Sequence, residues 1–238
     1  MPKLDPPVLA IFDHDGVLVD SLELHQNAWM ELGRRENLPI TAEFIHETFG
    51  MTNPSIFERL LGGSVHAEEL QRYGDIKETC YRDAACKTIA LLDGVRPFLD
   101  ALTAHGAALA IGSSGVLPNL HLTVETCGLS GRFAAIASLE DIQRGKPDPQ
   151  VFLVAARKVG IPPAACVVFE DATVGVQAAK AAGMLAVGVT TTHSAESLFA
   201  AGADHVIHHF SECDVSTLIA ELQARAGGRT ASEKRSIA

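Results

Sequence analysis

The stretch "VLAIFDHDGVLVDS", residues 8–21, decides the fold of this chain. Its five apolar residues, 8–12, predict a buried strand, and two carboxylates, Asp13 and Asp15, follow that strand directly. Because side chains alternate along an extended chain, these two carboxylates point to the same side. At about 4 Å they repel each other by roughly 4 kcal/mol at an effective dielectric constant near 20. A buried strand that ends in this way indicates a cation between the two acids.

The composition is that of a globular protein. Of 238 residues, 47% are hydrophobic and 20% are charged, which is enough to bury a core. The formal net charge of −10 at pH 7 argues against a nucleic-acid surface, which needs clustered Lys and Arg. Five scattered cysteines without a C-x-x-C pair fit reduced thiols in the cytosol. No apolar run is long enough for a signal peptide or a membrane span, so we expect a soluble, cytoplasmic protein that binds neither nucleic acid nor membrane.

Short β-type runs alternate with longer helical stretches over most of the chain. We expect strands at 8–12, 107–112, 133–137, 166–169, 185–189 and 205–207, and helices near 95–105, 116–127, 149–160, 173–183, 195–201 and 214–225. This alternation predicts βαβ crossovers and an α/β fold with a doubly wound parallel sheet.

One segment, about 22–89, interrupts this alternation with helical stretches alone. It predicts an all-helical domain inserted between the first and second strands. We therefore expect a core domain formed by 1–19 and 92–226 and a helical cap domain at 20–91. The last dozen residues lack an apolar face, so 227–238 are expected to form a flexible tail.

Polar residues follow the predicted strands, where ligands of open parallel sheets bind. Ser113, Ser114 and Gly115 follow the second strand, and Glu170 and Asp171 follow the fourth. Lys146 precedes the helix near 149–160. Its single ammonium group cannot balance the negative charge of the four carboxylates that follow the strands. A hard divalent cation can, and all-oxygen ligands suit Mg²⁺.

These segments, in this order, resemble the motifs of the haloacid dehalogenase superfamily of phosphotransferases. "DHDGVLVDS" resembles its D-x-D-G motif, "IGSSG" its serine/threonine motif, Lys146 its third motif and "FEDATVGVQAAKAAGM" its acidic fourth motif. The match runs from about Val8 to Val189. The helical insertion resembles the small cap of the subgroup that includes phosphoglycolate phosphatase and β-phosphoglucomutase, on a Rossmann-like core.

The resemblance implies catalytic roles for the residues that match its motifs. Asp13 would attack phosphorus and form an aspartyl phosphate. Asp15 would protonate the leaving oxygen and then take a proton from the attacking water. Ser113, the backbone amide of Ser114 and the adjoining Gly115 would hold the phosphoryl oxygens.

The resemblance also implies a Mg²⁺ site and a charge partner for the nucleophile. Asp13, the carbonyl of Asp15 and Asp171 would hold Mg²⁺, with Glu170 either a direct ligand or next to one. Lys146 would offset the charge between Asp13 and the phosphate.

Two histidines near the first motif raise separate questions. His14 departs from the family, which usually has an apolar residue between the two aspartates; alternation points it away from the site, so we expect a packed, hydrogen-bonded side chain. His25 and Trp29 are four residues apart and share a helical face. We expect Trp29 in the core of the cap. The spacing of His25 from Asp20 and Ser21 resembles that of β-phosphoglucomutase, which makes His25 a candidate for binding substrate.

The function that the resemblance implies is a Mg²⁺-dependent phosphatase that acts on a small phosphorylated metabolite, for example a sugar phosphate. The alternative is a phosphosugar mutase like β-phosphoglucomutase, which has an arginine in its cap. The corresponding stretch here, "FGMTNPSIF", offers Thr52 and Asn53 instead. Arg59, Lys77 and Arg82 could replace that arginine, but nothing in the sequence aims them inward.

A non-catalytic phospho-acceptor and an inactive binding module are weaker alternatives. Receiver domains carry their acceptor after the third strand, whereas that strand ends here in Ala137 and Ser138. Every motif residue is present, which argues against an inactive relative. We expect a monomer whose cap moves on hinges at 17–21 and 91–94 to admit substrate and then exclude water.

Overall fold

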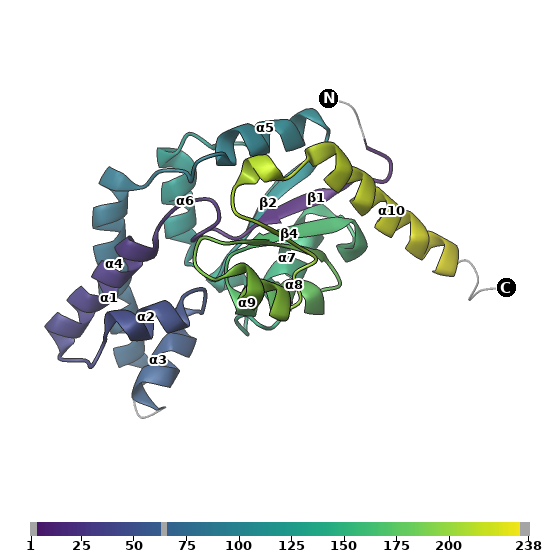
Figure 1. Cartoon of the computed structure of the whole chain (residues 1–238). Helices are drawn as coiled ribbons and strands as arrows, with labels where there is room; N and C mark the ends of the chain where they lie inside the picture. The colour runs from purple at the N-terminus through teal and green to yellow at the C-terminus, as the bar shows by residue number, and fades with distance from the viewer. Residues whose placement is uncertain (1–3, 63–65, 234–238) are drawn as a thin grey trace.

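The computed structural model describes residues 4–62 and 66–233. Its centre is a six-stranded sheet with the order β3-β2-β1-β4-β5-β6 (Figure 1). The strands are β1 (Leu9–Phe12), β2 (Ala108–Gly112), β3 (Ala135–Ala137), β4 (Cys166–Glu170), β5 (Leu185–Val189) and β6 (His205–Ile207). Each neighbouring pair runs parallel, which confirms the doubly wound α/β fold.

Helices cover both faces of the sheet. One face packs on α5 (Val95–Ala104), α6 (Leu117–Thr126) and α10 (Val215–Glu233), and the other on α7 (Gln150–Val159), α8 (Thr173–Ala181) and α9 (Ala195–Ala200). Short 3₁₀ helices occupy η1 (Leu139–Asp141), η2 (Pro163–Ala165) and η3 (Phe210–Glu212). Along β1 the side chains of Ala10 and Phe12 enter the first core and those of Leu9 and Ile11 the second. A strand buried on both faces must be apolar throughout, which explains the run at 8–12.

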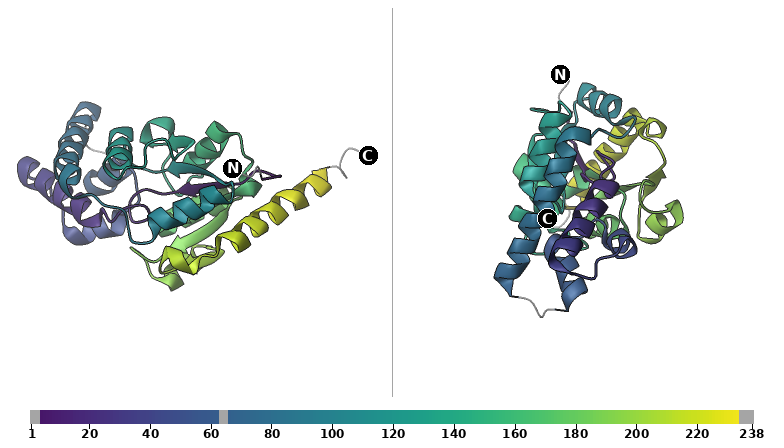
Figure 2. Two further views of the ribbon diagram at one scale, coloured as in Figure 1. Left: turned by 90° about the horizontal axis from the view of Figure 1, so that it is seen from above. Right: turned by 90° about the vertical axis from the view of Figure 1, so that its left-hand side faces the viewer.

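The helical segment forms a cap with a core of its own. It contains α1 (Leu22–Glu36), α2 (Ala42–Thr48), α3 (Asn53–Leu61) and α4 (Ala67–Thr88), and it lies at one end of the molecule (Figures 1 and 2). Trp29 is buried in this core of the cap, with its ring 5.0 Å from that of Phe57 in an edge-to-face contact, so the expectation for Trp29 is confirmed.

The two chain segments that join cap and core lie side by side. Val19 and Leu91 form an isolated antiparallel bridge, and Leu92 N donates to Leu18 O at 3.0 Å. The segments predicted as hinges are therefore neighbours and could bend together. Their motion, and the domain boundaries at 1–19, 20–91 and 92–226, stay predictions.

The C-terminal helix is longer than predicted. α10 continues to Glu233, so 227–233 of the expected flexible tail are helical, and 234–238 lie outside the described residues. Gly227 and Gly228 each cost about 1 kcal/mol relative to alanine in a helix. That cost does not end a helix that Leu218 and Leu222 anchor on the core. Figure 2 shows α10 pointing away from the cap.

No helix in the described part of the chain combines the length and the apolar character needed to cross a membrane. The monomeric state and the cytoplasmic location stay predictions.

Candidate active site

The register of the sheet brings the predicted site residues to one edge. β1 lies between β2 and β4, with Phe12 beside both Ile111 and Phe169. Asp13 follows β1, Ser113 follows β2 and Glu170 ends β4, so all three reach the carboxyl edge, with Ser113 one residue beyond the level of the other two. The order of strands along the chain thus places distant motifs next to one another.

Lys146 connects the nucleophile candidate to the acidic motif. Its Nζ lies 2.9 Å from Asp13 Oδ2 and donates a hydrogen bond to Glu170 Oε1, and all three side chains are buried. Burial alone would lower the pKa of Lys146, but the carboxylates of Asp13 and Glu170 hold this pKa above its ordinary value. Lys146 is therefore a fixed positive charge beside Asp13.

A buried acidic cluster fits the predicted metal. Asp13, Glu170 and Asp171 each offer a ligand atom, and these atoms all lie within 4.8 Å of one another. Asp13 Oδ1 and Asp171 Oδ1 are buried without a hydrogen-bond partner among the described residues. Burial raises the pKa of Asp171 well above its ordinary value, and the charges of Glu170 and Asp13 raise it further. Unpaired, buried carboxylate oxygens suit a hard divalent cation such as Mg²⁺.

Glu170 differs from the other two acids because the protein occupies both of its oxygens. Oε1 accepts from Lys146, and Oε2 accepts from the backbone amide of Ala172 at 2.9 Å. Burial raises the pKa of Glu170 to about 7, against the opposing effect of Lys146. Of the two roles open to Glu170, these contacts favour holding Lys146 over binding the metal directly.

Two glycines make room for the acidic cluster. A Cβ on Gly16 would lie 1.9 Å from Asp171 Oδ2, and Gly16 has a φ of +73° that side-chain-bearing residues rarely adopt. A Cβ on Gly175 would lie 1.8 Å from Glu170 Oε1. Both glycines belong to the quoted motifs, where they permit the close approach of the carboxylates.

Asp15 is held by three side chains at one oxygen. Its Oδ1 accepts from Ser21 Oγ at 2.5 Å and lies 2.9 Å from His14 Nδ1 and 3.0 Å from His25 Nε2. Burial would raise the pKa of Asp15, but His25 and His14 hold it well below its ordinary value. Asp15 is therefore ionised in this arrangement, the form that accepts a proton.

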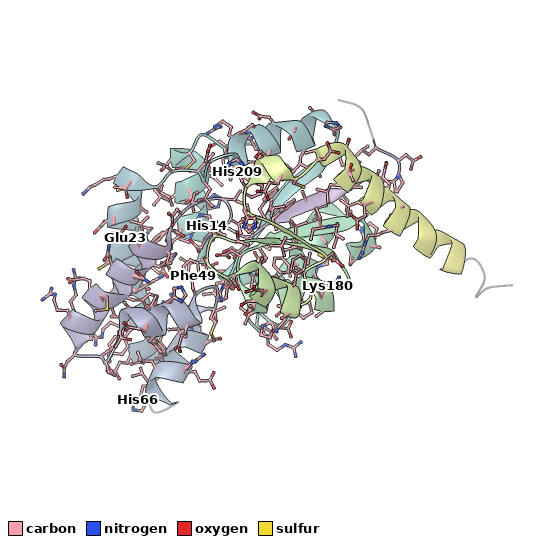
Figure 3. The ribbon with its side chains drawn as sticks, viewed as in Figure 1. His14, Glu23, Phe49, His66, Lys180 and His209 are labelled. Carbon is pink, nitrogen blue, oxygen red and sulfur yellow. The ribbon has the colours of Figure 1, made fainter. Side chains whose placement is uncertain are left out.

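His14 is packed and hydrogen-bonded as expected, but the expectation that it points away from the site is wrong. Its Nε2 lies 2.8 Å from Thr123 Oγ1 on α6, while its Nδ1 contacts Asp15. β1 ends at Phe12, so the alternation of an extended strand no longer applies at His14. Figure 3 shows His14 between the sheet and the cap.

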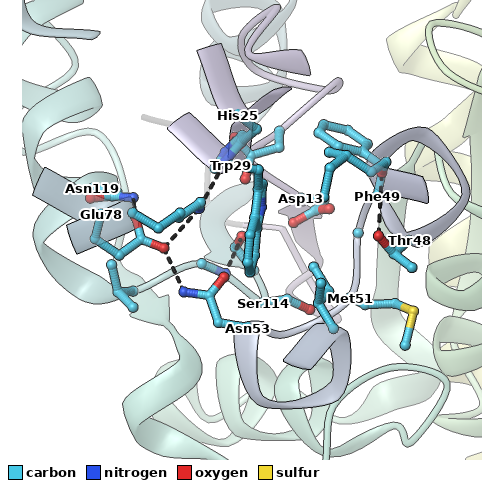
Figure 4. A pocket seen from close by; sticks show the side chains of 18 residues that line it. Asp13, His25, Trp29, Thr48, Phe49, Met51, Asn53, Glu78, Ser114 and Asn119 are labelled. Carbon is cyan, nitrogen blue, oxygen red and sulfur yellow. Dashed lines mark hydrogen bonds and ion pairs between the residues drawn. The ribbon is translucent and has the colours of Figure 1, made fainter. Parts of the chain in front are cut away.

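A cavity of about 50 Å³ separates these residues from the cap. Figure 4 shows side chains of both parts around it. The core contributes Asp13, Asp15, Ser113, Ser114 and Gly115, and the cap contributes His25, Trp29, Asn53, Lys77 and Glu78. Ser114 Oγ is buried and has no hydrogen-bond partner in the part of the chain that the structure describes, so it is available to a ligand. His25 lines the cavity, and its direct contact with substrate stays a prediction.

Sequence reasoning missed two threonines and left the direction of one lysine open. Thr192 Oγ1 donates to Asp171 Oδ2, and Thr191 Oγ1 donates to Gly16 O. Both follow β5, so the strand-end rule could have found them. Lys77, which no sequence feature aimed inward, lines the cavity and lies 2.9 Å from His25 Nδ1.

A parallel α/β core with these strand-end residues and a helical cap is typical of phosphoryl-transfer enzymes of the haloacid dehalogenase type. The chain belongs to this family: the family model of haloacid dehalogenase-like hydrolases matches residues 10–189. It is 29% identical to validoxylamine A 7'-phosphate phosphatase of Streptomyces hygroscopicus subsp. limoneus, over 86% of this chain and 94% of that protein. It is 30% identical to β-phosphoglucomutase of Bacillus subtilis, over 90% of this chain and 94% of that protein.

Among solved structures, a family IA hydrolase from Entamoeba histolytica superposes with a TM-score of 0.81 at 26% identity, covering 91% of this chain and 99% of that chain. The fold, the family and the phosphatase relatives together make this chain an enzyme of the phosphoric monoester hydrolase type.

Proposed function

We propose that this enzyme is a Mg²⁺-dependent phosphatase that hydrolyses a small phosphorylated metabolite through an aspartyl phosphate on Asp13. The observation that carries the proposal is the state of Asp13. Its Oδ2 is held by Lys146, and its Oδ1 is buried at the cavity with no partner in the described structure. A carboxylate that no structural hydrogen bond occupies on this side is open to a phosphate ester and a cation, which supports Asp13 as the nucleophile.

The reaction would proceed in two displacements. A carboxylate oxygen of Asp13 attacks phosphorus, an O–P bond forms, and the bond to the leaving alcohol breaks as Asp15 donates a proton to its oxygen. Water then attacks phosphorus, Asp15 takes its proton, and the bond between phosphorus and Asp13 breaks to release phosphate. The dianionic ester raises the pKa of Asp15 as it enters, because like charges disfavour ionisation.

The remaining residues would neutralise charge and orient the phosphoryl group. Ser113 and Ser114 hold its oxygens, and Lys146 offsets the repulsion between Asp13 and the ester. Asp13, the carbonyl of Asp15 and Asp171 would hold Mg²⁺, which when bound supplies further positive charge next to the phosphoryl oxygens.

The validoxylamine A 7'-phosphate phosphatase relative supports hydrolysis of a sugar-like phosphate. The β-phosphoglucomutase relative, together with Lys77 at the cavity, supports a mutase as the second candidate. Incubation with β-glucose 1-phosphate and a bisphosphate primer separates the two: a mutase forms glucose 6-phosphate faster than it releases phosphate.

The test of the phosphatase begins with release of phosphate from an aryl phosphate with and without Mg²⁺. We expect Mg²⁺-dependent turnover by the wild type and none by Asp13→Asn, while Asp83→Asn, an exposed acid on α4, retains full activity. Acid quenching with a ³²P-labelled ester should leave a hydroxylamine-labile label on the wild type and on Asp83→Asn, but not on Asp13→Asn. Turnover by Asp13→Asn, or no turnover by any variant, would overturn the proposal.

A further inference from the structure

The cap side of the cavity carries a buried ion pair. Lys77 and Glu78 are 2% and 7% exposed, and Lys77 Nζ donates to Glu78 Oε1 at 2.8 Å. Among the lining residues, all within the described ranges, Lys77 is the one lysine or arginine. Its charge is therefore compensated before any substrate arrives.

Neither Arg59 nor Arg82, the cap arginines named above as substitutes for the mutase arginine, supplies a second cation to the cavity. Arg59 pairs with Glu47 on the surface, where Arg59 Nη2 donates to Glu47 Oε2 at 3.3 Å. Arg82 donates to Asn119 Oδ1 at 3.1 Å and reaches the cavity only through that amide.

Two amides hold Glu78 in place at the cavity. Asn53 Nδ2 donates to Oε1 at 2.7 Å, and Asn119 Nδ2 donates to Oε2 at 2.5 Å (Figure 4). Oε1 thus has two donors and Oε2 has one. Because a carboxylate oxygen accepts two hydrogen bonds, Oε2 can take one more from a hydroxyl group.

An anionic group at this end would face an unfavourable site. A second phosphate or a carboxylate would lose its hydration next to Glu78, while the nearby ammonium group is already paired. A hydroxyl group instead finds an acceptor in Glu78 and keeps its hydrogen bonding.

We propose that Glu78, held in place by the amides of Asn53 and Asn119, makes the cap select uncharged, polyhydroxylated leaving groups and reject anionic ones. The preferred substrates are then monophosphates of polyols or monosaccharides, and esters with a second phosphate or a carboxylate at the far end are poor substrates. The inference rests on the proposed phosphatase function.

The test compares kcat/KM for sorbitol 6-phosphate and 6-phosphogluconate, which differ at the far end by a carboxylate. The wild type should prefer the former by about 100-fold, since burying an uncompensated charge costs several kcal/mol. Glu78→Gln keeps the shape of the side chain and leaves the charge of Lys77 uncompensated, so it should lower this ratio of kcat/KM values by about tenfold. Asp75→Asn, an exposed acid one turn earlier on α4, is the matched control and should leave the ratio unchanged.

The ratio is measured on one preparation, so it does not depend on the folded fraction of a variant. If Glu78→Gln does not fold, Asn53→Lys places a cation on the same wall and should narrow the ratio too. Equal kcat/KM for the two esters in the wild type, or an unchanged ratio in the folded variants, overturns the selectivity. Absence of aryl phosphate turnover by the wild type would instead overturn the phosphatase function itself.

Discussion

Replacement of Asp171 by asparagine separates the requirements of folding from those of metal binding. The ligand oxygens of Asp13, Glu170 and Asp171 lie within 4.8 Å of one another, and two unit charges at that distance repel by roughly 3 kcal/mol at an effective dielectric constant near 20. Asp171 faces two such charges, and the attraction of Lys146 offsets about one of them. Asparagine keeps the size of the side chain and removes its charge.

We expect Asp171→Asn to stabilise the metal-free protein while abolishing its response to Mg²⁺. The raised pKa of Asp171 means that partial protonation already relieves some repulsion, so the gain at pH 8 should be about 1–3 kcal/mol. For a chain of this length that corresponds to a rise in Tm of roughly 2–12 °C. The same substitution should remove phosphatase activity.

The assay is thermal denaturation at pH 8 in the presence of EDTA and again with Mg²⁺. Asp83→Asn, which loses the same charge at the surface, controls for net charge. A lower Tm for Asp171→Asn than for the wild type in EDTA would refute the reasoning. So would an undiminished rise in Tm on adding Mg²⁺ to the variant.

Three further predictions concern the residues around this cluster. Because burial raises the pKa of Glu170 from 4.5 to about 7, its contribution to stability is full below pH 4.5 and is lost as the pH rises through 7, by roughly 3 kcal/mol. At pH 8 the ionised Glu170 adds to the repulsion within the acidic cluster, which Mg²⁺ relieves. Mg²⁺ should therefore raise Tm more at pH 8 than at pH 5.5, and equal rises in Tm at the two pH values would contradict this explanation. Lys146→Met leaves two buried carboxylates without their partner, so urea denaturation should show a loss of about 3–5 kcal/mol, and a change below 1 kcal/mol would be inconsistent with the buried pair. His14→Leu removes a side chain that holds the Asp15 carboxylate in place, so kcat/KM should fall more for alkyl phosphates, whose leaving oxygen needs a proton from a well-placed Asp15, than for aryl phosphates. An equal fall for both ester types would assign His14 a purely structural role.

The sequence by itself determined the sheet and the acidic end of the site. The apolar run at 8–12 predicts a buried strand, and parallel neighbours place Asp13, Ser113 and Glu170 at one edge. These relations follow from local pattern and register, which the order of residues along each strand encodes. The same rule applied after β5 would also have found Thr192.

Only the tertiary structure decided what the cap contributes. Lys77 and His25 are 52 residues apart, and Glu78 and Asn119 are 41 apart, yet both pairs are in contact. The first contact depends on how two helices of the cap pack on each other, and the second on how the cap docks on the core, neither of which local periodicity specifies. His14 shows the same limit at short range: the chain leaves the extended conformation after Phe12, and its side chain then turns toward Asp15.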